Sequence, residues 1–196
     1  MSRTPRLTAL VVILAVVLAI GALSLLAACG GGGGGGSTPT APPPPPPPPP
    51  AQPSVTFTPT MAGGAGSVAL AMGAGSTPTK LVLEVRSGGI QDLYGVAFDL
   101  QYPSNLLQLT QVSPGTLLTG GTFQQSQTTG NVIVGVSRLG VAPGISDAGV
   151  VATVEFKPLV SGTGLLSFSR NTALDSAGKP ISVTWIAGAV TTVVVP

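Results

Sequence analysis

The feature that most constrains the fold is an alternation of apolar and less apolar residues from about residue 54 to the end of the chain. Its clearest stretch is residues 94–102, where Tyr, Val, Phe, Leu and Tyr occupy every second position. Side chains two residues apart in a strand point to the same face of a sheet. The residues between them, Gly95, Ala97, Asp99 and Gln101, are therefore expected on the opposite, exposed face. Apolar residues at helical spacing are nearly absent, so the pattern predicts strands.

Nine further segments have the alternation or the β-branched composition of strands: residues 67–72, 80–86, 106–112, 122–128, 132–137, 150–157, 165–170, 181–186 and 189–195. Turn sequences rich in Gly, Ser and Pro separate them. Within these segments, Val150 and Ala152 are expected to face inward, and Val82 and Val151 outward. About nine short strands at this spacing predict an all-β, antiparallel sandwich over residues 54–196. The region has no cysteine, so a packed core must stabilise it.

The N-terminus has the composition of an export signal. Arg3 and Arg6 precede an almost wholly apolar run, residues 7–26, and this arrangement is typical of a secretory signal peptide over residues 1–28. A membrane-spanning anchor is the alternative, because about 20 apolar residues can cross a bilayer. Leu26-Ala27-Ala28-Cys29 resembles a bacterial lipobox. The resemblance implies cleavage before Cys29, lipidation of Cys29, and an exported protein anchored to the cell envelope, at the outer membrane or cell surface.

Residues 29–53 have a composition that does not support a packed fold. Seven glycines, residues 30–36, are followed by nine prolines, residues 42–50. Consecutive glycines form a flexible coil, and consecutive prolines favour the extended polyproline II helix. The segment is therefore interpreted as a disordered tether that holds the folded domain away from a surface. A proline-rich ligand for an SH3-like domain is a weaker interpretation, because an exported bacterial chain is not expected to meet such domains.

Charge and residue types exclude several functions. After residue 28, six basic residues balance six acidic ones, so no basic patch is available to bind nucleic acid. Histidine is absent and Cys29 is the only cysteine, which removes the commonest general base and metal ligands. Asp99 and Glu155 form the one carboxylate pair worth testing for glycosidase chemistry, and Ser176 to Lys179 has a Ser-x-x-Lys spacing within a turn. We expect a non-enzymatic protein with no catalytic residues, no cofactor and no metal site; calcium at Asp147 or Asp175 is a weak alternative.

The order of motifs resembles the cohesin domain. The shared motifs are Tyr94-Gly95 before an alternating strand, Val112-Ser113-Pro114-Gly115, the strand "GVVATVEFK" at residues 149–157, and the turn Asp175-Ser176-Ala177-Gly178. The resemblance covers about residues 67–195. It implies a nine-stranded antiparallel jelly-roll sandwich that binds dockerin modules of polysaccharide-degrading complexes.

The resemblance fails at the positions that carry recognition. Type I cohesins have an Asn and an Asp on the strand that meets dockerin, and the aligned positions here are Gly95 and Ala97. If this face still binds a partner, the residues expected to do so are Ala97, Asp99, Gln101, Ile133, Gly135 and Ser137. Exposure of Ile133 is the informative point, since a flat protein-binding face needs an apolar centre.

Two other functions stay open from the sequence. Carbohydrate-binding modules share this architecture, but a sugar-binding platform needs exposed aromatic rings. Tyr94, Tyr102 and Trp185 are in phase with inward-facing residues and are expected in the core. A structural role in an envelope assembly is the third alternative. The expected function is that of a lipid-anchored, non-catalytic binding module whose partner is a dockerin-like protein or a polysaccharide.

Overall fold

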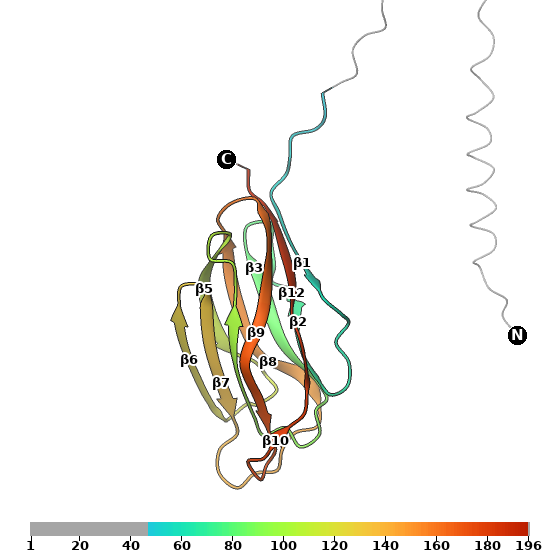
Figure 1. Cartoon of the computed structure of the whole chain (residues 1–196), viewed down its shortest axis with the longest axis vertical. Helices are drawn as coiled ribbons and strands as arrows, with labels where there is room; N and C mark the ends of the chain where they lie inside the picture. The colour runs from blue at the N-terminus through green and yellow to red at the C-terminus, as the bar shows by residue number, and fades with distance from the viewer. Residues whose placement is uncertain (1–46, 196) are drawn as a thin grey trace, which may run out of the picture. The chain divides into compact units, whose positions relative to one another are not determined.

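The computed structural model describes residues 47–195, which contain two stacked β-sheets (Figure 1). The predicted signal peptide, Cys29 and most of the predicted tether lie outside the described residues. Residues 47–53 are exposed and have no regular secondary structure. Residues 48–196 form one compact unit, and among the described residues no helix is long and apolar enough to cross a bilayer.

The described part of the chain contains twelve strands and no helix. Their bounds are β1 (Ser54–Pro59), β2 (Ser67–Met72), β3 (Leu81–Gly88), β4 (Gly95–Gln101), β5 (Leu107–Pro114), β6 (Thr122–Thr128), β7 (Asn131–Ser137), β8 (Ala148–Pro158), β9 (Gly162–Leu174), β10 (Pro180–Ile181), β11 (Thr184–Ile186) and β12 (Gly188–Val193).

The strands form two layers (Figure 1). A seven-stranded sheet has the order β1-β12-β9-β4-β7-β6, with β10 paired to β9, and a five-stranded sheet has the order β11-β2-β3-β8-β5. All pairs are antiparallel except β11–β2, which is parallel. The predicted all-β sandwich is confirmed. The sequence pattern missed β1, which has Pro53 before it and Pro59 as its last residue, and it merged β10 and β11 into one strand over residues 181–186.

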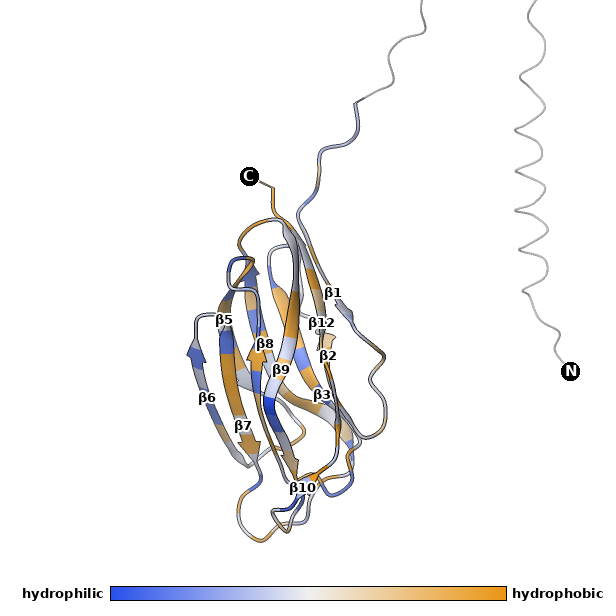
Figure 2. Ribbon diagram, in the orientation of Figure 1, coloured by the Kyte–Doolittle hydropathy of each residue, from blue (hydrophilic) through white to orange (hydrophobic). Residues whose placement is uncertain are grey.

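The core lies between the two sheets and is built from alternate side chains. In β4, Val96, Phe98 and Leu100 are buried, and in the facing sheet Leu83 and Val85 are fully buried. Hydrophobic residues alternate with hydrophilic ones along the ribbons in Figure 2. The described residues contain no disulfide, so burial of apolar surface must provide most of the stability of the domain. It contributes about 25 cal/mol per Å² of surface removed from water.

The expected orientation of Val151 and the expected exposure of Val82 are both wrong. The β3–β8 pairing shifts register so that Val85 pairs with Ala152 and Arg86 with Val150. Val151 is the extra residue of this bulge, and it is buried while Val150 is only half-buried. A bulge reorients the side chains that follow it. Val82 is also buried, because the loop that contains Gly73 and Ser76 folds over it and hydrogen-bonds its backbone.

We predict that Leu83→Ala destabilises residues 48–196 by about 2–5 kcal/mol, since it opens a cavity in a fully buried position. The measurement is urea-induced unfolding followed by tryptophan fluorescence. Val141→Ala is the control, because Val141 is fully exposed and its truncation should change the free energy of unfolding by less than about 0.5 kcal/mol. Equal effects of the two substitutions would contradict a core at this place.

Candidate functional site

The candidate site is the solvent-facing side of β6, β7, β4 and β9, called the outer face below. These four strands are consecutive in the seven-stranded sheet. Their registers place the outward side chains in rows: Thr122, Gln124, Ser126 and Thr128 from β6; Ser137, Gly135, Ile133 and Asn131 from β7; Gly95, Ala97, Asp99 and Gln101 from β4; Leu174, Thr172, Ser169 and Ser167 from β9. The face is made mainly of small and uncharged residues.

Small side chains make one part of the outer face concave. Ala97, Gly135 and Ser137 line a shallow depression of about 280 Å³ together with Gln124 and Thr172. A side-chain carbon added to Gly135 would meet no atom within 4 Å, so glycine there leaves open space above the sheet. A protruding side chain of a partner could enter this depression.

Beside the depression lies the exposed apolar residue that the sequence singled out. Ile133 is 39% exposed, and it also lines a second shallow hollow of about 260 Å³ with Ala97 and Gln124. An exposed β-branched side chain among small neighbours is the kind of apolar centre that protein-binding surfaces have. The expected exposure of Ile133 is therefore confirmed, while its role in binding stays a prediction.

The expected exposure of Asp99 is wrong, although its side chain does lie on the outer face. Asp99 is only 5% exposed, because the side chain of Arg170 covers it. Nε of Arg170 donates a hydrogen bond of 2.8 Å to Oδ2 of Asp99, and Nη2 donates to the same oxygen. Nδ2 of Asn131 donates a third bond, of 3.2 Å. Period-two alternation gives the direction of a side chain but not what lies above it.

Arg170 is the main residue of this face that the sequence analysis missed. Its side chain is 74% exposed, and its φ of 45° lies in the left-handed region, which costs energy for a residue other than glycine. The strain follows from an irregularity in the β4–β9 pairing, where Ala97 pairs with Thr172 but Asp99 pairs with Ser169. The only sequence signal was a single charge at the end of a predicted strand.

Asn131 completes the cluster around the buried carboxylate. Its Oδ1 atom is buried and has no hydrogen-bond partner among the described residues. The amide could not turn over to relieve this, because Oδ1 would then face the carboxylate of Asp99, which also only accepts hydrogen bonds. The Asp99–Arg170–Asn131 cluster therefore holds the guanidinium in one place but leaves the buried Oδ1 atom of Asn131 without a hydrogen bond.

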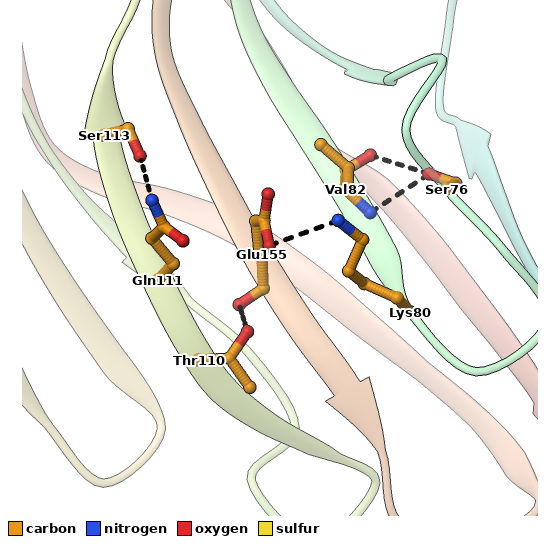
Figure 3. A network of polar contacts seen from close by, with 7 residues as sticks. All are labelled: Ser76, Lys80, Val82, Thr110, Gln111, Ser113 and Glu155. Carbon is orange, nitrogen blue, oxygen red and sulfur yellow. Dashed lines mark hydrogen bonds and ion pairs between the residues drawn. The ribbon is translucent and has the colours of Figure 1, made fainter.

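The carboxylate pair considered for glycosidase chemistry does not meet. Asp99 faces outward from the seven-stranded sheet, whereas Glu155 faces outward from the five-stranded sheet, on the opposite side of the sandwich. Figure 3 shows Glu155 paired with Nζ of Lys80 at 3.4 Å, with Thr110 bonded to its backbone carbonyl. Two carboxylates on opposite surfaces cannot act on one glycosidic bond.

The other chemical candidates have structural roles. Ser176 to Lys179 forms a turn in which Oδ1 of Asp175 accepts hydrogen bonds from the backbone N–H groups of Ala177 and Lys179. The carboxylate of Asp92 joins three loops: it accepts bonds from the hydroxyl and the N–H of Ser176 and from the N–H of Gly144. These bonds, chiefly that from the Ser176 hydroxyl, hold the pKa of Asp92 below its ordinary value. Within residues 47–195, no cluster of three metal-ligating side chains is found.

The aromatic residues do not form a sugar-binding platform. Trp185 packs against Phe98 and Phe168, with ring centroids 6.2 and 5.2 Å away, and Tyr102 packs on Phe156 at 5.0 Å. The Tyr94 hydroxyl donates a hydrogen bond to the carbonyl of Gly140. The predicted inward packing is confirmed for Tyr102 and Trp185, which contact the core, whereas Tyr94 is half-buried and is not among the core residues.

Comparisons with known proteins agree with this geometry. A model of the cohesin domain family matches residues 79–192. A type II cohesin domain from the cellulosome of Acetivibrio cellulolyticus is 18% identical, with a TM-score of 0.56 over 65% of this chain and 95% of its own. A non-cellulosomal cohesin from the archaeon Archaeoglobus fulgidus is 20% identical, with a TM-score of 0.53 over 72% of this chain and 92% of its own.

A third structure is a type I cohesin–dockerin complex from Clostridium thermocellum. Its matched chain is 13% identical, with a TM-score of 0.51 over 67% of this chain and 90% of its own. At these identities the three structures establish the shared fold and leave the partner of this chain open. Curated protein sequences give no match.

We predict that Arg170→Met lowers the free energy of unfolding by about 1–3 kcal/mol, because it removes two of the three hydrogen bonds to the buried carboxylate of Asp99 and leaves only the one from Asn131. Urea unfolding at pH 7 provides the measurement. Arg86→Met is the matched control, since the Arg86–Glu84 pair is exposed and such pairs contribute about 0–1 kcal/mol. A loss no larger than that of Arg86→Met would show that Asp99 does not depend on Arg170.

We also predict a pH-dependent contribution from Asp92. Because its pKa is lowered in the folded state, its stabilising effect is present above the unfolded-state pKa of about 3.9 and is lost as pH falls through the lower folded value. Asp92→Asn keeps a residue that tolerates the φ of 54°. The urea midpoint of Asp92→Asn should lie below that of the wild type at pH 7, and the difference should shrink toward pH 2.

Asp147→Asn is the control for this titration, because Asp147 is exposed and its side chain makes no hydrogen bond among the described residues. Its midpoint should follow that of the wild type at both pH values. A constant difference between Asp92→Asn and the wild type from pH 7 to pH 2 would contradict the assignment.

Proposed function

Because this chain belongs to the cohesin domain family, we propose that its outer face binds a dockerin-type protein module and that the protein acts as a non-catalytic attachment site. Cohesin domains are protein-binding modules and not enzymes. The observation that supports this use of the face is the exposed Ile133, which lines one of two adjacent shallow hollows that share Ala97 and Gly135. A flat sheet face with an apolar centre and a polar rim suits docking of a folded partner.

Recognition on this face must differ from that of type I cohesins. Gly95 and Ala97 occupy the positions of the polar pair expected by resemblance, so hydrogen bonds from those side chains are not available. The exposed donors of Arg170 lie one strand away and are held by the Asp99 carboxylate. Arginine is one of the residues enriched at the energetic centres of interfaces. The partner is therefore expected to offer a hydrogen-bond acceptor to Arg170 and an apolar contact to Ile133.

Attachment to the cell envelope is part of the same proposal. Cys29 in its lipobox-like sequence would carry the lipid, and the Gly and Pro tracts between residues 30 and 50 would hold the domain away from the membrane. A dockerin-bearing enzyme that degrades polysaccharide would then be held at the surface of the exporting cell. Carbohydrate binding by this domain itself is less well supported, because its aromatic rings pack in the core.

The test is binding of residues 48–196 to a panel of type I and type II dockerin modules by calorimetry, with insoluble cellulose as a parallel ligand. We expect at least one dockerin to bind, and Ile133→Lys to weaken that binding by at least tenfold, since it places a hydrated charge at the centre of the interface. Met72→Lys is the matched control, because Met72 is 42% exposed, close to the 39% of Ile133, and lies on the other sheet.

Retention on cellulose without binding to any dockerin would overturn the proposal in favour of a carbohydrate-binding module. Equal loss of dockerin binding in both lysine variants would mean that the outer face is not the contact surface.

A further inference from the structure

One continuous part of the chain, residues 100–137, contains no charged residue. It supplies β5 and β6, which are the edge strands of the two sheets on the same side of the sandwich. Figure 1 shows β6 at one margin of the domain, with β7 on its inner side. Edge strands carry unpaired backbone groups, and soluble proteins usually protect them with charges, prolines, bulges or short length. An edge without such protection therefore points to a partner strand.

Of the four edges, β6 is the one without any of these protections. β1 has Pro53 before it and Pro59 at its end, β11 has only three residues, and β5 has a register shift near Thr110 and ends at Pro114. In contrast, β6 pairs with β7 over seven consecutive residues without a shift. Its sequence, TFQQSQT, contains no charge and no proline, and Figure 2 shows it as largely hydrophilic.

The register with β7 identifies which backbone groups of β6 are free. Thr128 and Asn131 flank the two-residue turn Thr129-Gly130, and Gly130 has a φ of 78°. In such a hairpin the flanking pair is hydrogen-bonded and the bonded pairs then alternate. The backbone N–H and C=O groups of Phe123, Gln125 and Gln127 therefore point away from β7. In the part of the chain that the structure describes, no strand pairs with this edge.

We propose that the outer edge of β6 pairs with β6 of a second copy of this chain, antiparallel about a two-fold axis at Gln125. In this register Gln125 lies opposite its counterpart, and Phe123 lies opposite Gln127 of the second copy. All three residues are those with free backbone groups, so each would gain its missing hydrogen bonds. Because β6 carries no charge, no like charges meet across the axis, as would happen for a charged strand paired with itself.

A groove beside β6 supplies further contact area for the same partner. The groove has a volume of about 580 Å³ and lies between the β5 and β6 edges. Tyr102, Leu107, Leu109 and Leu159 contribute apolar surface to it, and Gln127 and Thr128 line its β6 side. A seven-residue edge alone buries less area than a stable dimer needs, so the uncharged groove increases the area available to a second copy.

The geometry leaves the outer face free. A two-fold axis that relates antiparallel strands of one sheet is perpendicular to that sheet, so both copies present their outer faces on the same side. The side chains that belong to the outer face on β6, such as Gln124 and Ser126, point away from the paired edge. A dimer would thus hold two binding faces side by side, which favours bivalent partners.

The experiment measures the mass of residues 48–196 by analytical ultracentrifugation. This unit contains every described strand and the whole described core. For a small interface of this kind we expect a weak dimer, with a dissociation constant on the order of 100 µM. Gln125→Lys and Gln125→Glu should each be monomeric at that concentration, because like charges then face each other at the axis. An equimolar mixture of the two variants should restore the dimer, since the charges are then opposite.

Gln91→Lys and Gln91→Glu are the matched controls, because Gln91 is exposed in the turn between β3 and β4 and belongs to no strand; both should dimerise as the wild type does. The restoration in the mixture separates pairing at Gln125 from a loss of folding, which mixing would not repair. A wild-type domain that stays monomeric up to 1 mM would overturn the proposal. The proposal would also be overturned if Gln125→Lys alone, or Gln125→Glu alone, formed a dimer as readily as the wild type. Neither result depends on dockerin binding.

Discussion

Burial of alternate apolar side chains between two sheets is the constraint on which the rest of this structure depends. Few charged residues and no described disulfide are available, so the packed layer of Phe98, Leu83, Phe156 and their neighbours must hold the strands in register. Because inward positions of β4 and β7 are committed to that layer, the positions between them form a second, outward set. The outer face exists as a consequence of the core.

The composition of the outer face decides what it can recognise. Small residues such as Ala97 and Gly135 leave hollows beside Ile133, and the only charged groups among its rows are Asp99 and the Arg170 that covers it. A surface with so little charge offers little long-range steering of a partner, and binding must come from shape, apolar contact and a few hydrogen bonds. The strained backbone of Arg170 fits this picture, because strain in folded proteins concentrates where a side chain must be held in one place.

The cohesin fold is retained here, whereas Gly95 and Ala97 stand where the resemblance places the polar pair of type I cohesins; a shared fold does not by itself determine the partner. Charged residues are few in this domain, which leaves the outer face nearly neutral and leaves the β6 edge without a protecting charge. These surfaces are adjacent but use different atoms: side chains on the face and backbone groups at the edge. The proposed binding of a foreign module and the proposed pairing with a second copy therefore do not compete for the same atoms.

Alternation along residues 94–102 and 132–137 was enough to predict the sandwich, the inward position of Phe98 and Tyr102, and the exposure of Ile133, because the direction of a side chain in a regular strand depends on its position in the strand. The same rule could not show that Asp99 is buried, since its cover comes from Arg170, 71 residues further along the chain. It also failed at Val151, where a bulge against β3 changes the face, and at β1, which is recognisable as a strand only through its pairing with β12. Local sequence determined which way side chains point; pairing between distant strands decided what covers them, because burial and register depend on neighbours that are far away in the sequence.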